Sequence, residues 1–146
     1  MTTLATLRWW LLGVLSLGLA GTLVELVLTE HYEDGWQMVP IAVAGAALGA
    51  VAWHAVRPDG VNIRVVQLLM VAVMVVGAVG VGLHFNGAAE FQREIDPTQS
   101  GWPLFAKVMR VKAPPMLAPG LMTQLGALGL VYVYFQRSIY GSRGSD

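Results

Sequence analysis

The stretch that decides the fold of this chain is VVQLLMVAVMVVGAVGVGLHF, residues 65–85. Only Gln67 and His84 interrupt its apolar residues, and none of its side chains is an acid, a lysine or an arginine. A helix needs about 20 apolar residues to cross the roughly 30 Å hydrocarbon core of a bilayer. Because backbone amides and carbonyls find no water at that depth, a single segment can satisfy them only as a helix. The stretch therefore predicts a transmembrane helix.

The composition of the whole chain is typical of a membrane protein. Of its 146 residues, 55% are hydrophobic and 12% are charged, and the mean hydropathy is +0.60. A soluble domain carries about 25% charged residues, roughly twice as many. The formal net charge is zero, so no global field indicates a nucleic-acid partner. The absence of cysteine excludes disulfides, thiolate metal sites and cysteine nucleophiles.

Three further apolar runs are long enough to cross the same core, at residues 9–28, 37–56 and 117–135. We therefore expect an all-α polytopic membrane protein, with a four-transmembrane-helix bundle forming one integral membrane domain over residues 1–146. Gly45 and Gly49 are small residues four apart, which predicts a close contact with another helix. The first run follows Arg8 and also resembles a signal peptide, but it exceeds the apolar length of about 7–15 residues typical of one.

The loops between the runs predict the orientation in the membrane. The short segment RPDGVNIR, residues 57–64, carries Arg57 and Arg64 close to two spans. Short basic loops remain on the cytoplasmic side of a membrane. We therefore expect a protein of the bacterial inner membrane with both termini in the cytoplasm. The segments 29–37 and 86–116 then lie on the outer, periplasmic side.

The outer segment 86–116 is long enough to have structure of its own. A short extra-membrane helix is predicted by GAAEFQRE, residues 87–94, and it ends before Pro97. An amphipathic helix lying in the interface is predicted by WPLFAKVMRVK, residues 102–112. Its apolar and basic sides are formed by Leu104, Phe105, Val108 and Val111, and by Lys107, Arg110 and Lys112. The alternative is that the apolar side packs on a partner subunit.

Acidic residues and histidines gather in two places, and both places adjoin an apolar run. These are TEHYEDGWQ, residues 29–37, and HFNGAAEFQREIDP, residues 84–97. Glu25 lies inside the first run, where an ionised carboxylate needs a partner or a polar interior. Imidazole and carboxylate together suit Zn, Fe, Mn, Ni or Cu(II). We therefore predict a divalent or iron-type metal site at the outer mouth of the bundle, for metal handling or redox chemistry, formed by Glu25, His31, Asp34, His84, Glu90 and Glu94.

The spacing of these residues leaves other functions open. Carboxylate-bridged metal centres in four-helix bundles use Glu-x-x-His, which this chain lacks. The main alternative is a non-catalytic accessory or assembly subunit of a larger membrane complex, with the charged segments as docking surfaces or as ion pairs that clamp the outer loops. Further alternatives are a b-type haem held by His31 and His84, and a small homo-oligomeric transporter with Glu25 in its path. We expect His54, near the cytoplasmic end of the second run, to be a hydrogen-bonded residue of the membrane interface that is too far away to join either cluster.

Overall fold

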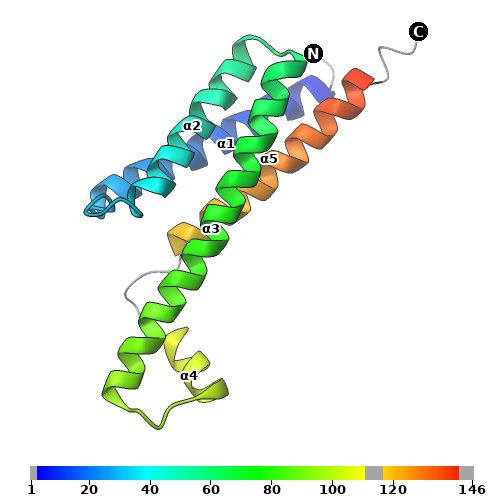
Figure 1. Ribbon diagram of the computed structural model, residues 1–146. Helices are drawn as coiled ribbons and strands as arrows, with labels where there is room; N and C mark the ends of the chain where they lie inside the picture. The colour runs from blue at the N-terminus through cyan, green and yellow to red at the C-terminus, as the bar shows by residue number, and fades with distance from the viewer. Residues whose placement is uncertain (1–2, 111–116, 142–146) are drawn as a thin grey trace.

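The computed structural model describes residues 3–110 and 117–141, and this part of the chain is helical (Figure 1). The helices in chain order are α1 (Thr3–Leu28), α2 (Met38–Val56), α3 (Gly60–Ile95), α4 (Gly101–Val108) and α5 (Leu117–Gly141). Within the described residues, three segments are long and apolar enough to cross a membrane, namely Ala5–Leu28, Met38–Val56 and Gly60–Ile95. The prediction of an all-α protein with membrane-spanning helices is confirmed to this extent.

The four long helices form a bundle in which packed neighbours run in opposite directions (Figure 1). One end, which we call the terminal end, holds the start of α1, the connection between α2 and α3, and the last turns of α5 (Figure 1). The opposite end, the histidine end, holds the loop 29–37 and the start of α5. The helix α3 continues past the histidine end and carries α4 against its last turns (Figure 1).

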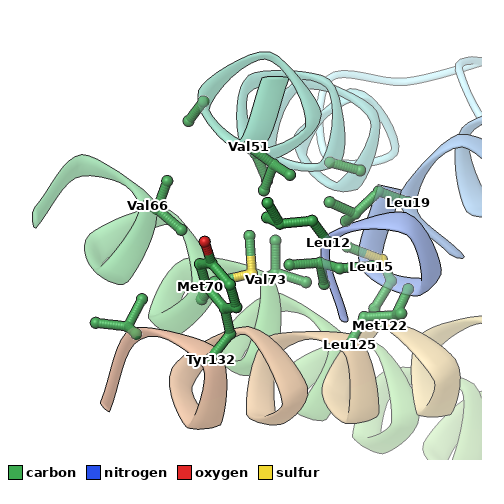
Figure 2. Packing of buried hydrophobic residues seen from close by; sticks show 14 of the residues in the cluster. Leu12, Leu15, Leu19, Val51, Val66, Met70, Val73, Met122, Leu125 and Tyr132 are labelled. Atoms are coloured by element: carbon green, nitrogen blue, oxygen red, sulfur yellow. The ribbon is translucent and has the colours of Figure 1, made fainter. Parts of the chain in front are cut away.

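The core of the bundle is apolar and receives side chains from all four long helices. Figure 2 shows these side chains meeting between the helices: Leu12, Leu15, Leu19, Val51, Val66, Met70, Val73, Met122, Leu125 and Tyr132. Other large apolar side chains on the same helices are exposed, among them Leu17, Leu68 and Val75. A helix that is apolar on all sides requires an apolar environment outside the core as well as inside it. The arrangement is therefore suited to a bundle surrounded by lipid.

The helix α3 is a single helix of 36 residues, about 54 Å long at 1.5 Å per residue. It begins at a capping box, in which the Asp59 carboxylate accepts from the Asn62 amide (2.8 Å) and Asn62 Oδ1 accepts from the Asp59 amide (3.0 Å). It ends at Asp96, because Pro97 disfavours the helical conformation of the residue before it. The prediction of a separate short helix over 87–94 is wrong. Residues 87–94 contain no proline, so nothing in them prevents the continuation of α3.

The helices α3 and α5 approach each other so closely that only glycine fits at their crossing. A Cβ added at Gly77 would lie 2.6 Å from the backbone nitrogen of Thr123, and one added at Gly126 would lie 2.6 Å from a backbone nitrogen of α3. By contrast, nothing lies within 4 Å of a Cβ added at Gly45 or Gly49. The helix contact predicted at that pair is therefore absent from the part of the chain that the structure describes.

The helix α4 packs on the part of α3 that extends beyond the bundle. Leu104 and Val108 are buried against Ala88 and Ala89 of α3. The predicted amphipathic helix is thus present over its first two turns. Leu104 and Val108 are covered by α3 of the same chain, whereas Phe105 on the predicted apolar side is exposed. Residues 111–112, the last of the predicted helix, lie outside the described residues.

The connection between α3 and α4 is a turn built on Asp96. Its carboxylate accepts hydrogen bonds from the Thr98 hydroxyl (2.6 Å), the Thr98 amide (3.1 Å) and the Gln99 side-chain amide (3.0 Å). These bonds, the Thr98 hydroxyl first among them, stabilise the charged form and hold the pKa of Asp96 below its usual range. The turn reverses the chain so that α4 lies against α3.

Candidate functional site

Two imidazole rings come together at the histidine end of the bundle. His31 lies in the loop after α1, and His84 lies on α3. Their ring centres are 6.3 Å apart, and the ring planes are nearly parallel, at 20° to each other. Both side chains are partly buried. The pair is therefore neither enclosed by the protein nor fully exposed.

A defined backbone motif at the end of α1 places His31. The His31 amide donates to the Leu26 carbonyl (2.9 Å), and the Glu30 amide donates to the Val27 carbonyl (3.1 Å). These two bonds form a Schellman motif, in which the residue after the helix is left-handed and usually glycine. That residue is Glu30, with φ 54°. A side chain in this conformation costs about 1–2 kcal/mol, and such strain concentrates at functional sites.

The carboxylate of Asp34 is engaged in the turn before α2. Its Oδ1 accepts from the backbone amides of Trp36 (2.8 Å) and Gln37 (2.9 Å). The Gln37 side chain in turn accepts from the Glu33 amide (2.9 Å). Asp34 is exposed and stabilises the loop 29–37. In this arrangement it supports the position of His31 from a distance.

The other three predicted metal ligands are spread over two helices. Glu25 is partly buried on α1, while Glu90 and Glu94 are exposed on α3. At 3.6 residues per turn, Glu90 and Glu94 leave α3 about 120° and 80° away from His84 around its axis. Among the described residues, no group of three or more histidine, aspartate or glutamate side chains is placed to hold a metal ion. Of the six predicted residues, the structure brings His31 and His84 together.

A second polar cluster lies inside the terminal end. His54 is fully buried, with Nδ1 2.8 Å from Asn62 Oδ1 and Nε2 3.0 Å from the Tyr132 hydroxyl. Arg8 Nε donates to the same hydroxyl (3.3 Å), and Asn62 Nδ2 donates to the Arg57 carbonyl. This cluster, which we call the His54 network, joins α1, α2, α3 and α5.

The partners of His54 assign its tautomer and explain its role. An amide oxygen only accepts, so the proton of neutral His54 lies on Nδ1, which donates to Asn62, and Nε2 accepts from the Tyr132 hydroxyl. A buried polar group left without a partner costs about 1–3 kcal/mol, so the network favours one relative placement of the helices. The prediction of a hydrogen-bonded His54 is confirmed. Its partner Tyr132 could not be predicted, because 78 residues separate the two.

No family model matches the chain, and no curated protein or solved structure matches it. The two polar clusters are therefore the basis for assigning a function. They differ in access, because the pair of His31 and His84 is partly open, whereas the ring of His54 is buried and bonded at both nitrogens.

Proposed function

We propose that the chain is an integral membrane protein with four spans, and that its outer end binds a metal ion through His31 and His84. The fourth span is supported by α5, a helix of 25 residues that packs against α1 and α3. A bilayer that surrounds α1, α2 and α3 would also surround α5. The core is about 30 Å thick, so α4 and the last turns of α3 would project beyond it.

The positive-inside rule supports an orientation with the histidine end outward. Arg8 lies in the early turns of α1, and Arg57 and Arg64 flank the connection between α2 and α3, all at the terminal end. If these residues face the cytoplasm, so do both ends of the chain. The pair of His31 and His84 then lies on the periplasmic side of an inner membrane.

The observation that carries the metal proposal is the approach of the two imidazole rings, with 6.3 Å between their centres. A zinc ion lies about 2.0–2.1 Å from an imidazole nitrogen. Since each nitrogen lies about 1 Å from its ring centre, two imidazoles on one ion have centres about 5–6 Å apart. The separation in this protein is close to that range, which supports a single ion shared by the two rings.

Two protein ligands leave the remaining coordination positions open. Structural zinc sites are closed by four protein ligands, whereas sites that exchange ligands or react keep an open position. An open site at the outer surface suits capture and release of a metal ion, or redox chemistry on it. Imidazole donors favour Zn, Cu(II), Ni or Fe, while carboxylate and water donors suit Mn. The histidine pair alone therefore favours the first group of metals.

Elemental analysis of protein purified in detergent without chelators tests this proposal. The wild type is compared with His31→Ala/His84→Ala and with the matched control Glu90→Gln/Glu94→Gln. We expect near-stoichiometric metal in the wild type and in the carboxylate variant, and its loss from the histidine variant. An absorption spectrum of the same samples distinguishes haem iron from an ion bound directly by the side chains.

The other outcomes separate the competing sites. Loss of metal from both double variants would support the larger site predicted from the sequence, which includes the carboxylates of α3. A Glu25→Gln variant with normal occupancy would remove Glu25 from that site. Wild-type protein without any metal would contradict the proposal altogether.

The second candidate function is a non-catalytic accessory subunit of a larger membrane complex. It is favoured by Phe91 and Ile95, two large apolar side chains that are exposed on the part of α3 beyond the bundle. Exposed apolar clusters commonly mark contacts with other proteins. In this case the wild type would be metal-free and would co-purify with a defined partner at a fixed ratio. The Phe91→Ser/Ile95→Ser variant would lose that partner.

A further inference from the structure

We propose that α4 carries a lipid-docking surface that lies in the headgroup layer of the outer leaflet. The surface consists of Trp102, Phe105 and Met109. It rests on the proposed four-span arrangement and is independent of the metal site.

The exposure of these three residues shows that α4 is apolar on two faces. Their exposed fractions are 74% for Trp102, 40% for Phe105 and 53% for Met109. They follow one another at spacings of three and four residues, so they share one face of the helix. The other apolar face, with Leu104 and Val108, is buried against α3. A helix with a second apolar face needs a second apolar neighbour, and nothing in the described chain provides it.

An aromatic row connects this surface with the membrane-spanning part of α3. The rings of Trp102 and Phe105 stack with centres 5.1 Å apart, and the rings of Phe105 and Phe85 are 5.8 Å apart. Phe85 is the last residue of the apolar stretch 65–85. Aromatic side chains concentrate where a membrane meets water. The row therefore connects the exposed surface of α4 with the end of the apolar stretch of α3, where Phe85 is partly buried against the contact between the two helices.

The position of α4 relative to the membrane core indicates that lipid is the neighbour of its exposed apolar face. It contacts α3 between Phe85 and Ala89, which corresponds to about 0–6 Å beyond the end of the apolar stretch at 1.5 Å per residue. The headgroup layer on each side of the core is about 5–7 Å thick. The helix α4 is thus at the level of the headgroups, where an apolar face can reach the acyl chains and a basic side chain can reach phosphate.

The same helix offers a matched control on its other side. Lys107 is exposed and leaves α4 about 200° around the axis from Phe105. A residue at that position faces water when Phe105 and Met109 face lipid. The two sides can be compared directly, because the chain contains no cysteine to interfere with site-specific labelling.

The test uses spin labels on single cysteines in liposomes of phosphatidylcholine and phosphatidylglycerol. The sites are Met109→Cys for the docking surface, Lys107→Cys for the control, and Val75→Cys for the lipid-facing middle of α3. Collision rates with oxygen, which partitions into lipid, and with a polar nickel chelate, which stays in water, report the surroundings of each label. We expect the ratio of oxygen to nickel collisions to be several-fold higher at 109 than at 107, and highest at 75.

Three results would overturn the inference, and they are distinguishable. Equal ratios at 109 and 107, with a lipid-like ratio at 75, would show that α4 stands in water while the spans are correct. A label at 109 that is shielded from both reagents would show that protein covers the surface. A water-like ratio at 75 would contradict the proposed four-span arrangement, on which the docking surface rests.

Discussion

The substitution Gly77→Ala tests the close crossing of α3 and α5. The added Cβ would lie 2.6 Å from both the backbone nitrogen and the hydroxyl of Thr123, and 2.7 Å from the Pro119 carbonyl oxygen. Ordinary contact begins at 3.4 Å, so the shortfall is 0.8 Å. Two of these three atoms belong to the backbone of α5 and cannot rotate away. The two helices must therefore separate.

The expected loss of stability follows from this overlap. Inserting a methyl group into a packed interior costs about 1–3 kcal/mol. Against this, alanine is favoured over glycine in a helix by up to about 1 kcal/mol. We therefore expect Gly77→Ala to lower the free energy of unfolding by about 0–2 kcal/mol relative to the wild type. Thermal unfolding in detergent, followed by tryptophan fluorescence, measures the difference.

Gly82→Ala is the matched control, because it changes the same helix where nothing lies within 4 Å of the added Cβ. The two variants share the gain in helix propensity, so their difference isolates the overlap, about 1–3 kcal/mol. If Gly77→Ala proves as stable as Gly82→Ala, then α3 and α5 do not cross at the distance described and the reasoning fails.

Three further predictions concern other parts of the chain. Tyr132→Phe removes the hydroxyl that bonds Nε2 of the buried His54; we expect a loss of about 1–3 kcal/mol in thermal unfolding, and an unchanged melting temperature would show that the network does not stabilise the bundle. Glu30→Gly relieves the left-handed conformation at φ 54°; we expect a gain of about 1 kcal/mol in the same assay, with the position of His31 retained, and a loss would contradict the Schellman motif. The low pKa of Asp96 predicts that its turn is stable above its ordinary value of 3.8 and is lost as the pH falls through the lower folded-state pKa; amide hydrogen exchange at Thr98 across that range should show this, and Asp96→Asn should abolish the dependence.

The polar groups at the two ends of the bundle differ in their burial and in their hydrogen bonding. At the terminal end, the His54 network is buried and its members bond one another across four helices. At the histidine end, two imidazoles lie beside a strained residue, Glu30, and remain partly open. A bonded, buried network stabilises a single placement of the helices, whereas partly open nitrogen donors are available to a ligand.

The sequence alone determined where the long helices are. The predicted runs 9–28 and 37–56 correspond to α1 (Thr3–Leu28) and α2 (Met38–Val56), and both end at the predicted residues. Length and apolarity are local properties, because each helix satisfies its own backbone hydrogen bonds. Pro97 also predicts the end of α3, but the sequence does not predict that α3 continues through residues 86–95. A change from apolar to polar residues indicates that the surroundings of a helix change from apolar to polar, and it does not end the helix.

Only the tertiary structure decided which faces of the helices meet. The spans are apolar on every side and rich in glycine, so their pattern does not indicate which side turns inward. For this reason Gly45 and Gly49 were expected at a helix contact that Gly77 and Gly126 make instead. The fold brings His31 to His84, whereas the spacing of Glu90 and Glu94 along α3 sets their carboxylates on other sides of that helix. The sequence located imidazole and carboxylate side chains near one end of the bundle, and the fold determined that His31 and His84 are the pair that meets.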